Sequence, residues 1–505
     1  MAMERDAASP DFLPMAHRML RLLILVFALL LWGASARAAP GDHVFSQGYA
    51  AGGIATVDSG GAITAAGTFF GSVDFGGGVL TSVGMFAPDV YVAHFDSSGN
   101  HLWSAAFDHA NGFGGVVIDA MTTDAAGDVY IAGRLYDGDV DFGGGLLAGS
   151  NQLLIVKFSS AGVHQWSALY GDGVPNGIDA SAAGIAVAGS TTASLDFGGG
   201  AITTLGGRDI FYAVLDPSGA HLRSVGYGNA GNDQSAADVV IDSAGNVTIG
   251  GGMIGGVDFG GGVLGAVTAD LFLASFDSSG THRWSQVIAG SYAGGSSVVS
   301  VKPRLALHPA GSPLAVAGEM RGSIDFGGGL LSSNGQADVY LARYAADTGA
   351  HLSSTNIGGS TSEITEKLSI DSSDNTVITG TMFGDWDAGG GLLGYAGSSD
   401  LFVVSLDATD AHLWSASFGT ASSDSLGGNS IVPTTGDVVL WGGASSGVDF
   451  GGGALTDAQF YIVGIEGNGG GGAAALPSLG PASLLLLAGG VALLGVRRLR
   501  SRELD

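Results

Sequence analysis

A five-residue motif, Asp-Phe-Gly-Gly-Gly, recurs along most of the chain and limits what the chain can fold into. The motif occurs six times, and a degenerate copy with Ala in place of Phe fills the one gap in the series. Neighbouring copies lie about 62 residues apart, a period that predicts one supersecondary unit per repeat, packed against its neighbours. The copies begin at Asp74, Asp141, Asp196, Asp258, Asp325, Asp387 and Asp449.

Further landmarks recur with the same period and indicate four strands in each unit. Apolar or alternating runs of about five to eight residues are typical of strands. One run ends in Gly, a second follows the Gly-rich loop, and a His-x-x-Ser segment follows a short turn. Turns such as Asp96-Ser97-Ser98-Gly99 suit tight hairpins, because Asp caps the turn and Gly adopts a positive φ. The strand-ending glycines are Gly67, Gly133, Gly189, Gly250, Gly318, Gly380 and Gly442, and the histidines are His43, His101, His164, His221, His282, His351 and His412.

Seven units of four strands predict an all-β fold, a seven-bladed β-propeller of four-stranded blades. The two ends of the repeat array support a closed ring. The segment beginning at His43 matches the fourth strand of a unit that has no earlier strands, and Gln459 to Glu466 match a third strand with no fourth after it. We therefore expect the N-terminal strand to complete the last blade from the outside, which leaves no open sheet edge.

The composition agrees with many short strands and restricts the partners. The chain of 505 residues contains 90 Gly, only 12 Pro and no Cys, so cysteine metal sites and thiol nucleophiles are excluded. The formal charge is −28, and eight of the 18 Lys and Arg residues lie in the two terminal segments. The central region is therefore more acidic still and repels phosphate backbones, so we expect no nucleic acid partner.

Residues 1–38 are predicted to be a secretory signal peptide. Arg18 and Arg21 precede an apolar run from Leu22 to Trp32, and small-x-small patterns follow at Ala34 to Ala38. The apolar run is too short to span a bilayer comfortably. We expect signal peptidase to process the chain, and translation starts at Met1, Met15 or Met19.

The C-terminus has the order of a membrane-sorting tail. Residues 467–475 form a Gly-rich linker, and residues 476–505 form an apolar segment followed by arginines. By the positive-inside rule the arginines stay cytoplasmic while the propeller lies outside. The order resembles the tripartite tails of Gram-negative envelope proteins of the PEP, IPTL or Gly-Gly type, and Ala475 to Leu479 is close to the IPTL pattern. The resemblance implies a sorting protease and inner-membrane contact; a plain transmembrane anchor is the alternative.

The repeat unit resembles the bacterial SBBP-type β-propeller repeat and, more distantly, the NHL and quinoprotein repeats. The segment from Ile241 to Val247, the turn from Asp277 to Gly280, and Trp284 carry this likeness, which covers residues 43 to 466. The resemblance implies that the Ile241 strand is the innermost of its blade. It also implies that Trp103, Trp166, Trp284 and Trp414 pack between blades; the remaining copies have Phe45, Arg223 and Ser353.

Motifs that would carry catalysis or cofactor chemistry have structural explanations here. The two Gly-x-Gly-x-x-Gly matches, beginning at Gly260 and Gly389, lie between strands, whereas a dinucleotide site needs a strand followed by a helix. The repeated histidines occur once per blade and so do not converge on a metal, and the Asp-x-x-Gly turns lack the ligand spacing of a calcium loop. We therefore predict no catalytic residues and no cofactor, with calcium left open.

A candidate ligand face gathers the remaining charged residues. Five aspartates open third strands and could concentrate cations there, although capping of their own loops is the favoured alternative. An insertion near residues 286–304 ends in Lys302 and Arg304, and the matching loop of the next copy contains three further charges. Variable loops on a repeat frame are where recognition usually lies. The candidate residues are Asp89, Asp209, Asp270, Asp338, Asp400, Lys302, Arg304, Glu363, Glu366 and Lys367.

These features favour an exported, non-catalytic binding or adhesion scaffold over an enzyme. The expected location is the cell envelope or the exterior of a Gram-negative bacterium, and the expected ligand is a protein or polysaccharide of the envelope. Two alternatives stay open: a propeller hydrolase or lyase acting on polysaccharide, with calcium at the Asp-rich face, and a structural surface protein.

Overall fold

The computed structural model describes residues 39–467, except for residues 84–87, 110–113, 293–296 and 458. The predicted signal peptide, residues 1–38, and the sorting tail, residues 476–505, lie outside the described residues, as does the linker after Gly467.

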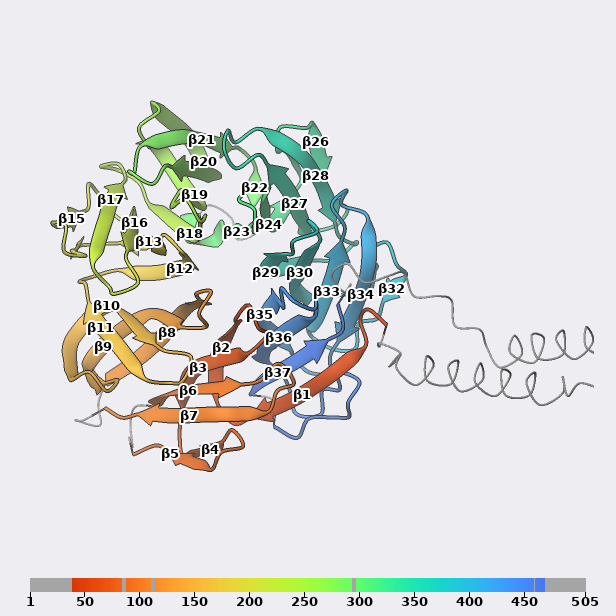
Figure 1. Ribbon diagram of the computed structural model, residues 1–505. Helices are drawn as coiled ribbons and strands as arrows, with labels where there is room; N and C mark the ends of the chain where they lie inside the picture. Colours follow the sequence, from red (N-terminus) through yellow and green to blue (C-terminus); the bar gives the residue numbers. More distant parts are fainter. Residues whose placement is uncertain (1–38, 84–87, 110–113, 293–296, 458, 468–505) are drawn as a thin grey trace, which may run out of the picture. The chain divides into compact units, whose positions relative to one another are not determined.

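The described chain forms a seven-bladed β-propeller, as the repeats predict (Figure 1). Every blade is an antiparallel sheet whose strands run outward from the centre of the ring in chain order, except in the last blade. From innermost to outermost, blade 1 has β2 (Gly52–Val57), β3 (Ile63–Phe69), β6 (Asp89–Phe95) and β7 (His101–Phe107); blade 2 has β8 (Gly114–Thr123), β9 (Val129–Asp141), β10 (Leu146–Phe158) and β11 (His164–Leu169); blade 3 has β12 (Val174–Ser181), β13 (Gly184–Thr191), β16 (Asp209–Leu215) and β17 (His221–Tyr227); blade 4 has β18 (Gln234–Ile241), β19 (Val247–Asp258), β20 (Val263–Phe276) and β21 (His282–Ile288).

The remaining blades follow the same order with two additions. Blade 5 carries an extra two-residue strand on β24, and η1 precedes its innermost strand. Blade 5 has β23 (Arg304–Leu307), β24 (Leu314–Arg321), β27 (Asp338–Tyr344) and β28 (His351–Ile357), with β22 (Ser291–Tyr292) and η1 (Val298–Ser300); blade 6 has β29 (Glu363–Ile370), β30 (Thr376–Met382), β33 (Asp400–Leu406) and β34 (His412–Phe418); blade 7 has β35 (Ser425–Ile431), β36 (Val438–Gly443), β37 (Phe460–Ile465) and β1 (His43–Tyr49).

The last blade is completed by the N-terminal strand, as predicted. β1 pairs with β37 in antiparallel register, with His43 opposite Ile465 and Tyr49 opposite Phe460. The strand order β1-β37-β36-β35 therefore joins the beginning of the described chain to its end (Figure 1). The strand phase inferred from the resemblance is also confirmed, because β18, which ends at Ile241, is the innermost strand of its sheet.

The hydrophobic core lies between neighbouring blades. One cluster joins Tyr130, Leu153 and Ile155 of blade 2 to Val187 and Phe211 of blade 3, all at most 1 % exposed. Burial of each such side chain contributes about 1.5–3 kcal/mol relative to full exposure. Because each blade has a core on both sides, β3 and β6 are buried along almost their whole length.

The Gly-rich motifs form small hairpins that fold against the outside of their own blades. Four of these contain short strand pairs: β4 (Ser72–Asp74) with β5 (Val79–Thr81), β14 (Ser194–Leu195) with β15 (Ile202–Thr203), β25 (Ser323–Asp325) with β26 (Leu330–Ser332), and β31 (Trp386–Asp387) with β32 (Leu392–Leu393). In blade 1, Asp74 Oδ1 accepts hydrogen bonds from the backbone N–H groups of Gly76 and Gly78 at 2.8 and 3.1 Å.

The repeated histidine is a structural residue that supports this hairpin. A Cβ atom on Gly77 would lie 2.1 Å from Cε1 of His101, so the glycine lets the loop rest on the imidazole ring. The Nε2 atom of His101 forms a hydrogen bond with Ser104 Oγ at 3.0 Å, and the same pairing recurs in all seven blades. The hairpin tip therefore contacts the outermost strand of its own blade.

Candidate functional site

The innermost strands of the seven blades surround a channel along the axis of the ring. A cavity of about 800 Å³ occupies it, within the range usual for ligand pockets. Every blade contributes at least one lining residue from its innermost strand. In blade order, these include Ile54, Asp119, Asn176, Asp238, Arg304, Glu366 and Asn429.

Five of the seven innermost strands carry a β-bulge that adds a side chain to the channel wall. The pairing of β12 with β13 skips one residue between Pro175 and Gly177, and β8, β18, β29 and β35 skip a residue at the equivalent position. Bulges re-aim side chains and are frequent beside functional sites. The skipped residues all line a channel cavity and differ in chemistry: Asp119, Asn176, Ala237, Glu366 and Gly427.

A second cavity, of about 400 Å³, lies at the end of the channel where the innermost strands begin. Blades 2 to 5 form its wall together with the segment around η1. Asn176 and Arg304 line both cavities, so the two are continuous through shared residues. The charged residues among its described lining are all basic: Arg134, Arg208, Lys302 and Arg304.

These four cations are paired unequally. The Arg134 guanidinium donates two hydrogen bonds of 2.8 Å to Asp119, which neutralises it. The Arg208 Nη1 atom donates to Ser190 Oγ at 2.9 Å, a neutral partner. The Arg304 Nη2 atom lies 3.6 Å from Glu366 Oε2, and its buried Nε atom has no hydrogen-bond partner among the described residues. Lys302 is exposed, and none of its side-chain atoms forms an ion pair with a described residue.

Carboxyl groups in the channel wall and beneath it connect neighbouring blades. Asp179 of blade 3 accepts a hydrogen bond of 2.8 Å from the N–H of Ile241 in blade 4, and burial raises the pKa of Asp179 to about 6. Glu319 of blade 5 accepts one of 2.7 Å from the N–H of Thr365 in blade 6, and burial raises the pKa of Glu319 to about 7. These carboxyl groups satisfy backbone N–H groups, so their role is to hold blades together.

The five predicted aspartates cap loops and are not exposed. Each is at most 3 % exposed and accepts a hydrogen bond from its own loop. Asp89, for example, accepts from the N–H of Val83 at 2.7 Å. The capping alternative therefore accounts for Asp89, Asp209, Asp270, Asp338 and Asp400, and these carboxylates do not form an open cation-attracting face. Among the described residues, no three His, Asp or Glu side chains are arranged to hold a metal ion.

The other predicted charges lie mainly in the channel, which the sequence did not reveal. Glu363, Glu366 and Lys367 belong to the innermost strand β29, so their assignment to a loop was wrong. Lys302, Arg304, Glu366 and Lys367 line the two cavities. Glu363 is fully buried and accepts hydrogen bonds from Gly359 N–H and Thr361 Oγ1, both at 3.0 Å.

Arg134, Arg208 and Asn176 line the channel but were not predicted from the sequence. The scarcity of basic residues in the repeats could have drawn attention to the two arginines. Residues 39–467 contain only ten Lys and Arg, and five of the ten line the channel: Arg134, Arg208, Lys302, Arg304 and Lys367.

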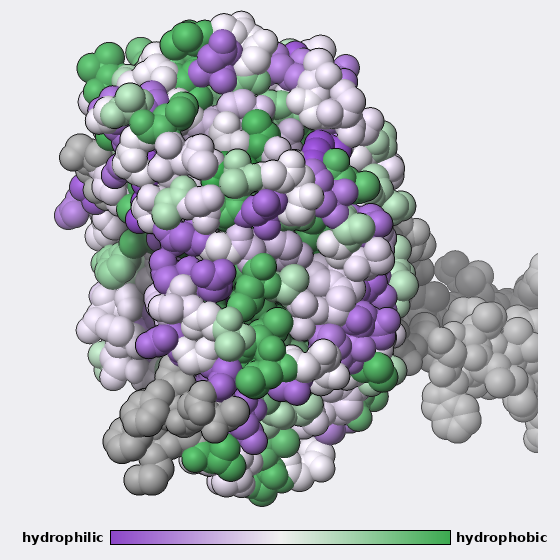
Figure 2. Space-filling view, turned by 90° about the vertical axis from the view of Figure 1, so that its left-hand side faces the viewer, coloured by the Kyte–Doolittle hydropathy of each residue, from purple (hydrophilic) through white to green (hydrophobic). Residues whose placement is uncertain are grey.

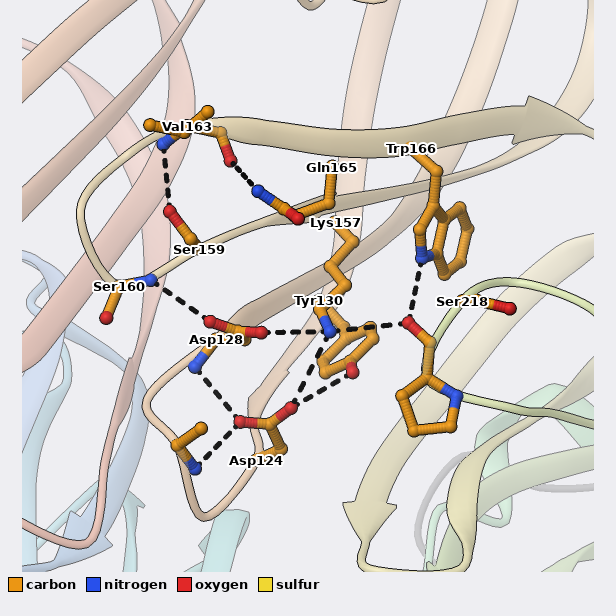
Figure 3. Close-up of polar contacts among 12 residues, drawn as sticks. Asp124, Asp128, Tyr130, Lys157, Ser159, Ser160, Val163, Gln165, Trp166 and Ser218 are labelled. Atoms are coloured by element: carbon orange, nitrogen blue, oxygen red, sulfur yellow. Dashed lines mark hydrogen bonds and ion pairs between the residues drawn. The ribbon is translucent and has the colours of Figure 1, made fainter.

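Most of the other basic residues are used in contacts between or within blades. Lys157 lies 2.9 Å from Asp128 Oδ2 and 4.8 Å from the centre of the Tyr130 ring (Figure 3). Beside it, the Trp166 indole donates to the carbonyl of Pro217 in blade 3 at 3.1 Å, so the tryptophans dock between blades as the resemblance implied. Arg223 takes the equivalent place in the next blade and donates to Ser278 O at 2.6 Å.

The outer side of the blades offers no comparable concentration of basic residues. Figure 2 shows one such side, where hydrophobic residues form separate areas among polar ones. Exposed aliphatic residues follow the Gly-rich tips in several blades, as at Val79, Val263 and Leu330. Within residues 39–467, apart from the four gaps, no helix is long and apolar enough to cross a membrane.

No protein-family model and no curated protein matches the sequence, so the SBBP-type assignment stays a prediction. Among solved structures, the chain is similar to the Dos1 propeller, with 9 % identity, a TM-score of 0.39 and coverage of 84 % of this chain and 95 % of that one. It is also similar to the Pan2 WD40 domain of Neurospora crassa, with 9 % identity, a TM-score of 0.39 and coverage of 82 % and 90 %. A protein of unknown function from Bacteroides caccae shares 10 % identity, with a TM-score of 0.33 and coverage of 65 % and 89 %.

Proposed function

We propose that this protein is an exported, envelope-anchored and non-catalytic binding scaffold whose glycan or protein ligand enters the central channel. The observation that carries the proposal is the contrast between the outside of the ring and its centre. The outer hairpins and their histidines repeat in every blade, whereas the bulge residues of the innermost strands differ from blade to blade. Recognition needs such local differences on a rigid frame.

The acidic side chains of the channel wall are mostly held in hydrogen bonds within the protein, which favours binding over hydrolysis. Glycoside hydrolysis needs two carboxyl groups that both face the substrate. In the channel wall, Asp119 is paired with Arg134, and Asp179 and Asp238 accept backbone hydrogen bonds from neighbouring blades. Glu366 lines the channel, but its neighbour Glu319 does not.

The location rests on the sequence of the two termini. A signal peptide over residues 1–38 and a tail over residues 476–505 support export to the envelope of a Gram-negative bacterium, with contact to the inner membrane. The likeness of the unit to SBBP-type repeats agrees with an exported propeller. Fractionation of cells that express the full chain tests this part: recovery in the cytosolic fraction would contradict it.

The binding function is tested by probing arrays of envelope proteins and polysaccharides with the purified full chain. We expect at least one class of ligand to bind, and an Ala237→Trp variant to lose that binding because the indole fills the channel. Ala201→Trp is the matched control, since Ala201 is exposed on an outer hairpin. Binding that survives Ala237→Trp, or turnover of a bound polysaccharide, would overturn the proposal.

A further inference from the structure

The basic residues of the propeller are concentrated at one end of its channel. The chain has a formal charge of −28, yet four of the ten Lys and Arg residues between positions 39 and 467 line the 400 Å³ cavity. They come from different parts of the chain: Arg134 lies on β9, Arg208 immediately precedes β16, and Arg304 begins β23. Folding therefore brings together cations that the sequence keeps far apart.

The positive charge in this cavity is only partly balanced. Asp119 neutralises Arg134, and Glu366 contacts Arg304 at the long distance of 3.6 Å. The Arg208 side chain has no carboxylate partner among the described residues, and Lys302 forms no ion pair there, although its charge acts with that of Arg304 to lower the pKa of Glu366 against the effect of burial. A half-buried guanidinium without a counter-ion is costly unless a ligand or solvent supplies the missing acceptors.

The segment that supplies Lys302 is firmly packed beside the channel. Val298 and Val301 are 2 % exposed, and both line the cavity. A Cβ atom on Gly252 of β19 would lie 2.3 Å from the Val298 carbonyl oxygen, so the glycine permits this close approach. The cavity wall is therefore built from packed backbone.

The remaining lining suits a small ligand with a polar and an apolar side. Asn176 offers its side-chain oxygen, because its Nδ2 atom already donates to Ser235 Oγ and the Ala236 carbonyl, and Val174, Val299 and Ala237 offer apolar contact. A volume of about 400 Å³ fits a small molecule. A long polyanion would meet the acidic remainder of the surface and be repelled, whereas a small anion would not.

We propose that this cavity, bounded by Arg134, Arg208, Lys302 and Arg304, binds a small anionic ligand, a sugar acid or a sugar phosphate. Guanidinium groups recognise carboxylate and phosphate oxygens through paired hydrogen bonds, and Lys302 adds a mobile point charge at the rim. The sugar ring then extends past Asn176 toward the larger cavity. This inference deepens the proposed function and rests on the channel being the binding site.

Calorimetric titration of the purified full chain with glucuronate, glucose 6-phosphate and neutral glucose tests the proposal. We expect one or both anions to bind, glucose to bind more weakly, and added salt to weaken the anions selectively. The double variant Arg208→Gln/Lys302→Gln should weaken anion binding by about tenfold or more, which corresponds to the loss of one or two charge-assisted contacts. Arg321→Gln, an exposed change in the same blade that lies outside both cavities, is the control and should bind as the wild type does.

Three results would overturn the proposal: equal binding of glucose and the anions, unchanged affinity in the double variant, or tighter binding of polygalacturonate than of its monomer. If neither anion binds while the array ligand is still blocked by Ala237→Trp, this inference fails and the proposed function stands. If the array gives no ligand but the anions bind through Arg208 and Lys302, this inference stands and the proposed binding of a glycan or protein ligand fails. Preference for one anion identifies carboxylate or phosphate as the recognised group.

Discussion

Glu319 shows how a single buried residue links two blades and makes stability depend on pH. Its carboxyl group is 8 % exposed, accepts the N–H of Thr365, and is close enough to Arg304 and Glu366 to be influenced by both charges. Burial is the main cause that raises its pKa from the ordinary 4.5 to about 7, and Glu366 adds to the increase while Arg304 opposes it.

A Glu319→Gln variant should therefore change the pH dependence of unfolding. Because the folded state holds the Glu319 proton more tightly than the unfolded chain, this group favours folding most below pH 4.5 and loses that contribution as pH rises through about 7. Gln cannot ionise and can still accept the Thr365 hydrogen bond. We expect the unfolding free energy of the variant, minus that of the wild type, to increase between pH 5 and 8 in urea titrations. The exposed change Asp137→Asn is the control; a flat difference for Glu319→Gln would contradict the account.

At the scale of elements, the recurring glycine of the second strand permits a close approach of the innermost strand, which is bulged at that point in several blades; Gly67 of blade 1 makes the same approach where β2 and β3 pair without a register shift. A Cβ atom on Gly189 would lie 1.8 Å from the carbonyl oxygen of Val174, and one on Gly380 would lie 1.8 Å from that of Ile364. Both glycines pair with the innermost strand where the register shifts. The glycine thus permits the close approach that lets the bulge present its extra residue to the channel.

A Gly189→Ala variant should destabilise the propeller and disturb the channel together. The new methyl group would overlap backbone atoms, which cannot move aside like a flexible side chain, so we expect a loss of at least about 2 kcal/mol. Gly265→Ala is the matched control, because no atom lies within 4 Å of a Cβ atom at that position. Guanidinium unfolding midpoints measure both; equal midpoints would contradict this explanation of the glycine.

The elements were more predictable from the sequence than the channel wall. Strands, turns and hairpins follow from local patterns, so the repeats predicted their order, and the family resemblance implied the docking of residues such as Trp166. One landmark was misplaced, since Gly251, rather than Gly250, makes the close contact in blade 4, with a Cβ atom 2.0 Å from the Ser235 carbonyl oxygen. The position of a bulge depends on how two strands pair. Because Gly250, Gly251 and Gly252 are consecutive, the sequence does not indicate which of them lies opposite the bulge.

The candidate site was only partly predictable because it depends on contacts between distant parts of the chain. Scarce charges drew attention to Lys302, Arg304, Glu366 and Lys367, which line the two cavities. Lys302 lies in a loop as expected, but the loop assignment of Glu366 and Lys367 was wrong, because an innermost strand that begins with charged residues looks like a loop in the sequence. Arg134 lies within a second strand and Arg208 beside a loop-capping aspartate, and only the packing of neighbouring blades brings both to the same cavity.

For the molecule as a whole, the ring closes where the first described strand completes the last blade. Without β1, the outer edge of β37 would be exposed, and blade 7 would lose the strand that carries His43 and Phe45. The hairpin of that blade also depends on β1, since a Cβ atom on Gly452 would lie 2.4 Å from Cε1 of His43. The pairing of β1 with β37 therefore joins the first and last parts of the repeat array.

Cross-linking of β1 to β37 tests the closed ring most directly. Because the chain contains no Cys, no native thiol can compete with the introduced pair. Gln47 lies opposite Ile462 in the register of β1 and β37, whereas Val463 points to the other face of the sheet. We predict that oxidation of the Gln47→Cys/Ile462→Cys variant forms an intramolecular disulfide and raises its unfolding midpoint, while Gln47→Cys/Val463→Cys forms little. Failure of the first pair to cross-link, or equal yields from both pairs, would contradict the closed ring.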